Sequence, residues 1–271
     1  MKPARFDIVR ASSIEHATRT LREADGEARI VAGAQSLGPM LNLRLAQPRV
    51  LIDITGIPEL TRISEGDDAV TIGACLTTAN IEDGRLPGTG LDHLSHVATR
   101  IAYRAVRNRG TIGGSLCHGD PAADWISVLC AVGAECNIVG PASRRRLQAG
   151  QFVTGAYETA LALDEMLEAI TLPRLSSRVR FGYFKLCRKA GEFALAMAAV
   201  LNDAERGRLR IVIGATKGRP IVLADGRQLL RGAELDEAAF CGVLEQHGIR
   251  ERTLQRQQFA ALTRAYGQTV Q

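Results

Sequence analysis

The stretch RNRGTIGGSLC (107–117) places two adjacent glycines among small residues, directly before the segment HGDPAADW (118–125). It is too polar and too rich in glycine for a buried strand, so we expect a loop that leads into a helix. A second stretch of the same kind, VAGAQSLG (31–38), follows a short apolar segment. Glycine accepts positive φ and lets a ligand approach the main chain closely. The two stretches are therefore the candidate binding elements of this chain.

Two such loops that converge would suit a pyrophosphate, because successive exposed N–H groups form an anion-binding concavity. The hydroxyls of Ser36, Thr111 and Ser115 and the amide of Gln35 add possible donors. The alternative is that both stretches are ordinary turns, as most glycine-rich segments are. Neither matches the P-loop pattern or the pattern GxGxxG at the start of a helix, which disfavours P-loop hydrolases and Rossmann dehydrogenases.

The composition is that of a globular protein, with 271 residues of which 46% are hydrophobic and 23% are charged. The net charge is +5, but the positive residues are scattered and only 4% of residues are aromatic, which disfavours nucleic-acid binding. The six cysteines form no CxxC pair, so we expect free, mostly buried thiols and no metal site. No apolar run approaches the ~18 residues of a membrane span, and the first residues lack an apolar signal segment. We expect a cytoplasmic protein.

Hydrophobic periodicity predicts strands and helices that alternate irregularly, with hairpins between them, which indicates an α+β fold rather than a doubly wound parallel sheet. A helix is expected over 12–26, with Ser12 or Ser13 as N-cap and Gly26 as its stop. A second helix is expected from Asp120 as N-cap, with Pro121 at its first position. The other expectations up to residue 173 are strands at 4–11, 28–33, 49–55, 135–140, 144–150 and 164–173, a hairpin at 60–74, and helices at 76–83 and 91–103.

The polar segment RLSSRVR (174–180) is the expected domain boundary. Beyond it, the segments 181–203 and 207–225 read as strands of one sheet, and 234–248 and 252–267 read as two closing helices.

The two glycine-rich stretches together carry a resemblance. VAGAQSLGPMLNLRLAQPRVLIDI (31–54), followed about 75 residues later by NRGTIGGSLCHGDPAAD (108–124), resembles the FAD-binding medium subunit of the molybdenum hydroxylases, the family of xanthine dehydrogenase and carbon monoxide dehydrogenase. FGYFKLCRKAGEFALA (181–196) is similar to the start of that family's C-terminal flavoprotein domain. The resemblance spans nearly the whole chain in the right order. It implies an FAD-binding domain over 1–175, with a small α/β lobe (about 1–55) and a larger α+β lobe (56–175), and a C-terminal domain over 176–271 with an antiparallel sheet and helices.

The resemblance also implies a set of cofactor contacts. In this family the first loop wraps the FAD pyrophosphate and the second motif closes on it. An aspartate holds the ribose or ribityl hydroxyls, and a lysine lies near the N1–C2=O edge of the isoalloxazine. The implied FAD-binding residues of this chain are Ala32, Gly33, Ala34, Gln35, Ser36 and Leu37; Ile101 and Ala102 on the preceding helix; Thr111, Gly113, Gly114 and Ser115; and Asp124, Leu167 and Lys185.

The chain departs from the family pattern at two of these positions. Ala34 stands where a second glycine is usual, so we expect its backbone to stay in a region open to L-residues. Ser115 stands where asparagine is usual, keeping a hydroxyl but losing the amide. Two residues have simpler alternatives, because Asp124 also suits the first turn of a helix without any ligand, and Lys185 also suits an exposed strand position. Phe193 lies where some relatives carry a ring near the flavin.

The resemblance implies an oxidoreductase component that carries FAD, has no catalytic residue of its own, and passes electrons from the [2Fe–2S] clusters of a small partner subunit to an external acceptor. A large partner subunit would carry molybdenum–molybdopterin, and the assembly could be a dimer of heterotrimers. The alternatives are a stand-alone flavin oxidoreductase with its own substrate pocket, and a scaffold subunit that has lost its flavin.

Overall fold

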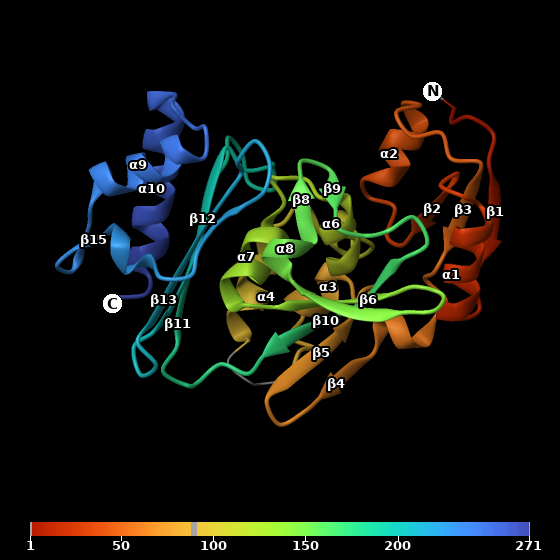
Figure 1. The fold of residues 1–271 in the computed structure, drawn as a ribbon, viewed down its shortest axis with the longest axis horizontal. Coiled ribbons are helices and arrows are strands. Elements are labelled where there is room, and N and C mark those ends of the chain that lie inside the picture. The colour runs from red at the N-terminus through yellow and green to blue at the C-terminus, as the bar shows by residue number, and fades with distance from the viewer. Residues whose placement is uncertain (1, 88–90, 271) are drawn as a thin grey trace.

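The structure is a computed structural model that describes residues 2–87 and 91–270. Within these residues, three sheets of three or more strands follow one another along the chain and across the molecule (Figure 1), and two further sheets have two strands each. The first sheet is parallel, in the order β1-β3-β2, and two helices lie in its connections. Its elements are β1 (Asp7–Arg10), α1 (Ile14–Glu23), β2 (Ala28–Val31), α2 (Leu37–Asn42) and β3 (Val50–Asp53).

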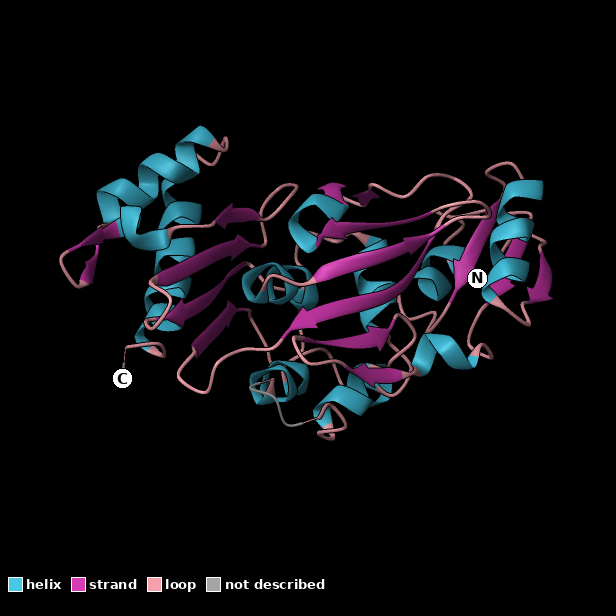
Figure 2. Ribbon diagram, turned by 60° about the horizontal axis from the view of Figure 1, so that its bottom comes forward, coloured by secondary structure: helices cyan, strands magenta, loops and turns pink. Residues whose placement is uncertain are grey.

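The second sheet is antiparallel, in the order β4-β5-β10-β6-β7. In the described part of the chain, five short helices lie between β5 and β6, and the last two of them, α6 and α7, pack against β10 (Figures 1 and 2). The strands are β4 (Ile63–Glu65), β5 (Ala69–Gly73), β6 (Glu135–Val139), β7 (Arg144–Gln148) and β10 (Met166–Pro173), after η1 (Pro58–Thr61). The helices are α3 (Thr78–Glu82), α4 (Asp92–Thr99), α5 (Arg104–Arg107), α6 (Ile112–His118) and α7 (Asp124–Val132); α8 (Ala149–Phe152), β8 (Val153–Gly155) and β9 (Glu158–Thr159) follow β7.

The third sheet is antiparallel, in the order β11-β12-β13-β14, and α10 lies along its outer face (Figure 1). At Gly182 of β11 a side chain would place its Cβ 1.9 Å from the carbonyl oxygen of Ala265, so glycine lets α10 lie directly on the strand. The elements are β11 (Arg180–Leu186), β12 (Ala196–Asp203), β13 (Arg208–Gly214), β14 (Ile221–Leu223), η2 (Gly226–Leu229), β15 (Leu230–Arg231), β16 (Glu234–Leu235), α9 (Glu237–Gln246) and α10 (Arg252–Gly267).

One hydrophobic core connects the second and third sheets. Helix α7, apolar except for Asp124 and Ser127, is buried on every side, and it packs against both β12 and β13. Trp125 of α7 belongs to the same core as Tyr183, Met197 and Val212 on the inner face of the third sheet. Because burial of apolar surface is the main stabilising contribution, this shared core fixes the third sheet against the helices that precede it.

The α+β prediction is confirmed, and the expected strands, hairpins and closing helices are present. Ser13 caps α1 by accepting a hydrogen bond from the His16 N–H. The prediction for the next long helix was wrong at its start, because α7 begins at Asp124 with Ala123 as N-cap. Asp120 instead forms a turn, in which its carboxylate accepts the Ala122 N–H at 2.9 Å.

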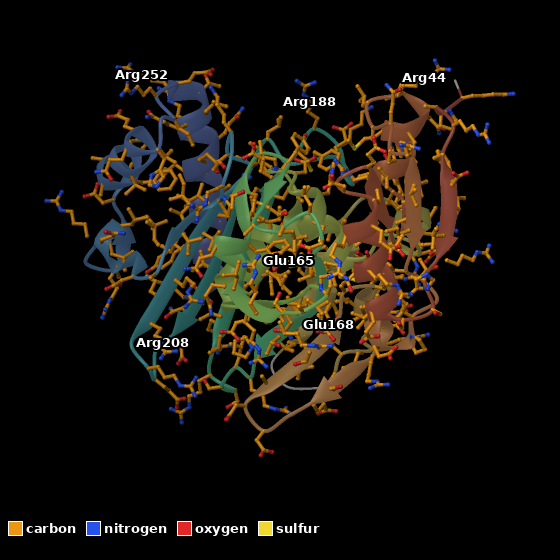
Figure 3. All side chains as sticks on the ribbon, turned by 45° about the vertical axis from the view of Figure 1, so that its right-hand side comes forward. Arg44, Glu165, Glu168, Arg188, Arg208 and Arg252 are labelled. Atoms are coloured by element: carbon orange, nitrogen blue, oxygen red, sulfur yellow. The ribbon has the colours of Figure 1, made fainter. Side chains whose placement is uncertain are left out.

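Arg44, Arg208 and Arg252 project from separate edges of the molecule (Figure 3). Among the described residues, no helix is both long and apolar enough to cross a membrane.

Candidate functional site

The first glycine-rich stretch forms the turn between β2 and α2. Ala34 adopts φ +58° in the left-handed region, so the expectation that its backbone avoids positive φ was wrong. Ser36, two residues later, is right-handed with φ −108° and ψ −48°. Left- and right-handed residues close together turn successive N–H groups toward one point. The turn itself therefore demands the positive φ, and alanine accepts it here at a conformational cost.

The backbone N–H groups of this turn are available to a ligand. Those of Gly38 and Met40 bond back to the carbonyls of Ala34 and Ser36, at 2.9 and 3.2 Å. The N–H groups of residues 33–37, in contrast, donate to no acceptor within the described part of the chain. The residues are half-buried, and the Ser36 hydroxyl makes no capping hydrogen bond. Clustered donors of this kind form an anion-binding concavity.

The second stretch was expected to be a loop, and that prediction was wrong from Ile112 onward. Residues Ile112–His118 form α6, and Thr111 caps it by accepting the Gly114 N–H at 3.0 Å. The N–H groups of Ile112 and Gly113 donate to the carbonyls of Leu76 and Ala74, at 3.0 and 2.9 Å. Because these donors bond within the chain, they are not available to a ligand. The start of α6 offers a ligand the exposed Gly114 and the hydroxyls of Thr111 and Ser115 instead.

Glycines allow both stretches to pack closely. A Cβ on Gly33 would lie 1.9 Å from the carbonyl oxygen of Arg109 and 2.9 Å from the Cα of Gly110. A Cβ on Gly113 would lie 2.5 Å from the Cβ of Ala74. The two stretches, about 75 residues apart in the sequence, are therefore in direct backbone contact, which only glycine permits.

Asp124 and Lys185 form a buried ion pair. The Lys185 Nζ lies 2.8 Å from Oδ1 of Asp124, and the two side chains are 3% and 7% exposed. The Tyr183 hydroxyl donates to the same oxygen at 2.5 Å. Burial raises the pKa of Tyr183 well above its usual value, and the neighbouring Asp124 carboxylate raises the pKa further. The alternative of an exposed strand position for Lys185 is wrong, because the residue is only 5% exposed.

Ile101 and Ala102 lie in a bend rather than on a helix, since α4 ends at Thr99. Ala102 has φ +44°, which is unfavourable for alanine. Lys185 donates to the carbonyl of Arg100 at 2.9 Å, so the ion pair with Asp124 reaches this bend. Beside the bend, Phe193 lines an open cavity of about 570 Å³ with Tyr103, Arg188, Gly191, Glu192 and Leu195.

The candidate residues thus fall into connected groups, and Leu167, buried on β10, joins them because β10 packs against α6.

Two residues were absent from the predicted set. Tyr183 is two positions before Lys185 on the same strand, and the period of two places both on one face. Arg107 carries no comparable signal, although it stands at the start of the second glycine-rich stretch. Among the described residues, no group of three or more His, Cys, Asp or Glu side chains is placed to hold a metal ion.

Comparison with known proteins identifies the family. Residues 4–175 match the FAD binding domain in molybdopterin dehydrogenase. The carbon monoxide dehydrogenase medium chain of Hydrogenophaga pseudoflava is 38% identical over 242 residues, which cover 88% of this chain and 84% of that one. The nicotine 6-hydroxylase medium subunit of Paenarthrobacter nicotinovorans is 36% identical over 227 residues, covering 83% of this chain and 79% of that one.

Solved structures agree with the sequence match. Carbon monoxide dehydrogenase from H. pseudoflava, in a form that lacks the Mo-pyranopterin moiety, superimposes with a TM-score of 0.86 at 30% identity over 100% of both chains. Quinoline 2-oxidoreductase from Pseudomonas putida 86 gives a TM-score of 0.84 at 30% identity, over 99% of this chain and 100% of that one. This chain belongs to the family of FAD-binding medium subunits of the molybdenum hydroxylases, and it is an oxidoreductase component.

Proposed function

We propose that this chain carries FAD within a multi-subunit molybdenum hydroxylase, accepts electrons from [2Fe–2S] clusters of a small partner subunit, and delivers them to an external acceptor. The observation that carries the proposal is the backbone contact of the two glycine-rich stretches at Gly33 and Arg109, beside a turn whose N–H groups are free to bind an anion. A dinucleotide cofactor has a pyrophosphate that such donors match.

Each group of candidate residues has a separate task in this proposal. The N–H groups of 33–37 and the hydroxyl of Ser36 bind the pyrophosphate, and Thr111, Gly114 and Ser115 close on its other side. The remaining predicted positions line the nucleoside and flavin parts: Ala32, Ile101, Ala102, Gly113, Asp124, Leu167 and Lys185.

The buried pair of Asp124 and Lys185 orients the flavin end of the site. The carboxylate of Asp124 is almost fully buried, and its Oδ1 accepts a hydrogen bond from Tyr183 and pairs with the ammonium group of Lys185. Lys185 in turn holds the main chain at Arg100, so its positive charge stays at one fixed point beside the bend. FAD supplies the hydride and electron chemistry when bound, and a fixed cation near its ring favours the reduced, anionic form.

The proposed partners are a large molybdopterin subunit and the small iron–sulfur subunit, with a dimer of heterotrimers as one possible assembly. The names of the relatives support this, because they are medium chains or medium subunits of larger enzymes. We also propose the division into domains at 175/176, with lobes of about 1–55 and 56–175. The extent of the family match, residues 4–175, supports it. All six cysteines are free, which supports a cytoplasmic location.

The test is an FAD titration of the purified chain, followed by anaerobic reduction with and without the partner subunits. We expect one FAD per chain, and reduction by the substrate of the complex only when the partners are present. A chain that binds no FAD, alone or in the complex, contradicts the proposal and indicates a scaffold role. Direct reduction of the isolated chain by an organic substrate indicates a stand-alone flavin oxidoreductase instead.

A further inference from the structure

Three consecutive main-chain carbonyls in the bend at residues 100–102 accept hydrogen bonds from side-chain cations. The Lys185 Nζ donates to Arg100 at 2.9 Å. The Arg107 Nη1 donates to Ile101 at 2.9 Å and to Ala102 at 3.1 Å. The bend is thus held from two sides, by β11 and by α5. It contains Ala102 in the left-handed region, a conformation that persists only where its surroundings impose it.

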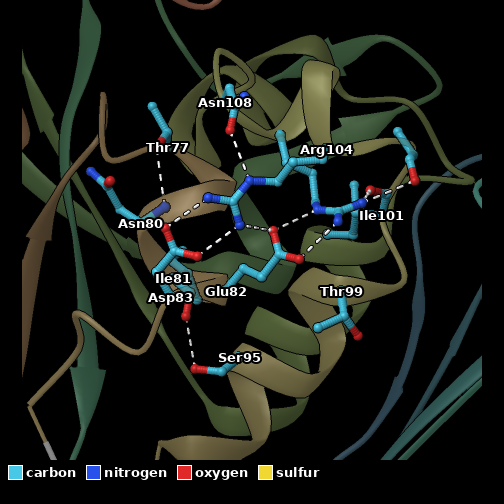
Figure 4. A network of polar contacts seen from close by, with 12 residues as sticks. Thr77, Asn80, Ile81, Glu82, Asp83, Ser95, Thr99, Ile101, Arg104 and Asn108 are labelled. Carbon is cyan, nitrogen blue, oxygen red and sulfur yellow. Dashed lines mark hydrogen bonds and ion pairs between the residues drawn. The ribbon is translucent and has the colours of Figure 1, made fainter.

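The Arg107 side chain is itself fixed, by Glu82 of α3. Its Nε and Nη2 each donate to one oxygen of Glu82 at 2.8 Å, and the two side chains are 11% and 15% exposed. Because Nε and Nη2 of the planar guanidinium both bind the Glu82 carboxylate, Nη1 remains as the donor to the carbonyls of the bend. Figure 4 shows the network around Glu82 and Ile101.

A third contact restrains the same bend. A Cβ on Gly191 would lie 2.8 Å from the carbonyl oxygen of Ala102, so the loop that follows β11 packs directly against it. If Arg107 were absent, the carbonyls of Ile101 and Ala102 would lose their donor. The strained φ of Ala102 would then lose its main support, and the peptide would rotate toward negative φ.

We propose that Arg107 is a positioning residue for FAD: it holds the Ile101–Ala102 bend in the shape that lines the flavin part of the site. This inference rests on the proposed function, because that function places the flavin beside the bend. Arg107 acts through the main chain of the bend, without contacting the cofactor itself.

The network contains a matched control. Arg104 binds the same Glu82 at 2.8 Å, and it also binds Asp83 and Asn108, but it makes no hydrogen bond to the bend. Its side chain is 48% exposed. Arg104→Gln therefore perturbs the same network without removing a donor from Ile101 or Ala102.

The experiment measures the Kd for FAD, the visible circular dichroism of the bound flavin, and the Tm of the FAD-free full-length chain. We expect Arg107→Gln to raise the Kd roughly tenfold or more and to change the circular dichroism of the flavin. Arg104→Gln should keep the Kd within about twofold. Arg107→Lys keeps the positive charge beside Glu82 and is used if the Gln variant does not fold. A single ammonium group cannot bind Glu82 and both carbonyls of the bend as the guanidinium does, so we expect this variant to raise the Kd for FAD as well.

A rescue separates positioning from plain stability. Ala102→Gly lets the backbone take φ +44° without strain, so adding it to Arg107→Gln, or to Arg107→Lys, should recover part of the FAD affinity. Unchanged Kd and circular dichroism in both Arg107 variants overturn the inference, as does an equal loss of affinity in Arg104→Gln. A wild-type chain that binds no FAD overturns the proposed function, and this inference with it.

Discussion

The ammonium group of Lys185, on the first strand of the third sheet, lies 2.8 Å from Oδ1 of Asp124, the first residue of α7. Tyr183 of the same strand donates to that oxygen. A buried carboxylate is tolerated only when it is paired and hydrogen-bonded, and both of these partners come from β11. The pair therefore ties the sheet that follows residue 175 to the helix that follows the second glycine-rich stretch.

Removing the cation leaves a buried, uncompensated carboxylate. We expect Lys185→Met to lower the free energy of unfolding by about 3–5 kcal/mol, measured by urea denaturation of the FAD-free chain. The double variant Lys185→Met with Asp124→Asn removes both charges. Its loss in free energy of unfolding should therefore be smaller than the sum of the losses in the two single variants.

The ion pair between Arg178 and Glu205 is the control, since its side chains are 75% and 44% exposed. Arg178→Met should change the free energy of unfolding by less than about 1 kcal/mol. Equal effects at Lys185 and Arg178 would show that the buried pair has no special role in stability.

In the first glycine-rich turn, we expect alanine at position 33 to lower the stability of the chain, and glycine at position 34 to raise it slightly. Gly33→Ala forces a Cβ to within 1.9 Å of a main-chain oxygen, so we expect a loss of about 3 kcal/mol and no measurable FAD binding. Ala34→Gly relieves the cost of φ +58° but adds freedom to the unfolded chain, so stability should rise by about 1 kcal/mol or less. Urea denaturation and FAD titration measure both, and a Gly33→Ala variant with wild-type affinity would contradict the proposed contact of the two stretches.

Local patterns predicted most of the elements. Ser13 as N-cap and the strand at 164–173 could be predicted from neighbouring residues in the sequence alone. The helical start of α6 did not follow from its sequence, because two glycines disfavour a helix. Its first turn is formed by the Thr111 cap and by the carbonyls of Ala74 and Leu76, from the distant β5 region.

The resemblance names candidate residues for the site but gives no geometry for them. The resemblance named Ala34 and Lys185, yet the positive φ of the first depends on the direction of the whole turn. The burial of the second depends on α7, which approaches from another part of the chain. Arg107 was not predicted, because its target is main chain, and a main-chain acceptor leaves no mark in the sequence.

The Thr111 cap gives a third prediction. Thr111→Val removes the acceptor for the Gly114 N–H, and we expect it to lower the free energy of unfolding by about 1 kcal/mol. Thr111→Ser keeps the oxygen and should retain nearly all of the stability. Urea denaturation distinguishes the two variants, and a Thr111→Val variant as stable as the wild type would contradict a stabilising role of the cap.

Tyr183 should give the folded chain a distinct response to alkaline pH. Burial and the Asp124 carboxylate raise its folded-state pKa, while in the unfolded chain a tyrosine ionises near pH 10. Stability from this residue is therefore fully present below about pH 10 and falls above it, because only the unfolded state then releases the proton. The fall in the free energy of unfolding approaches about 1.4 kcal/mol per pH unit.

Tyr183→Phe should lack this part of the pH dependence, although other ionisable groups still contribute to it. Tyr103→Phe makes the same substitution at a tyrosine that is 65% exposed and serves as the control. Unfolding free energies between pH 9 and 11 measure it, and identical slopes for wild type and Tyr183→Phe would mean that Tyr183 ionises as readily folded as unfolded.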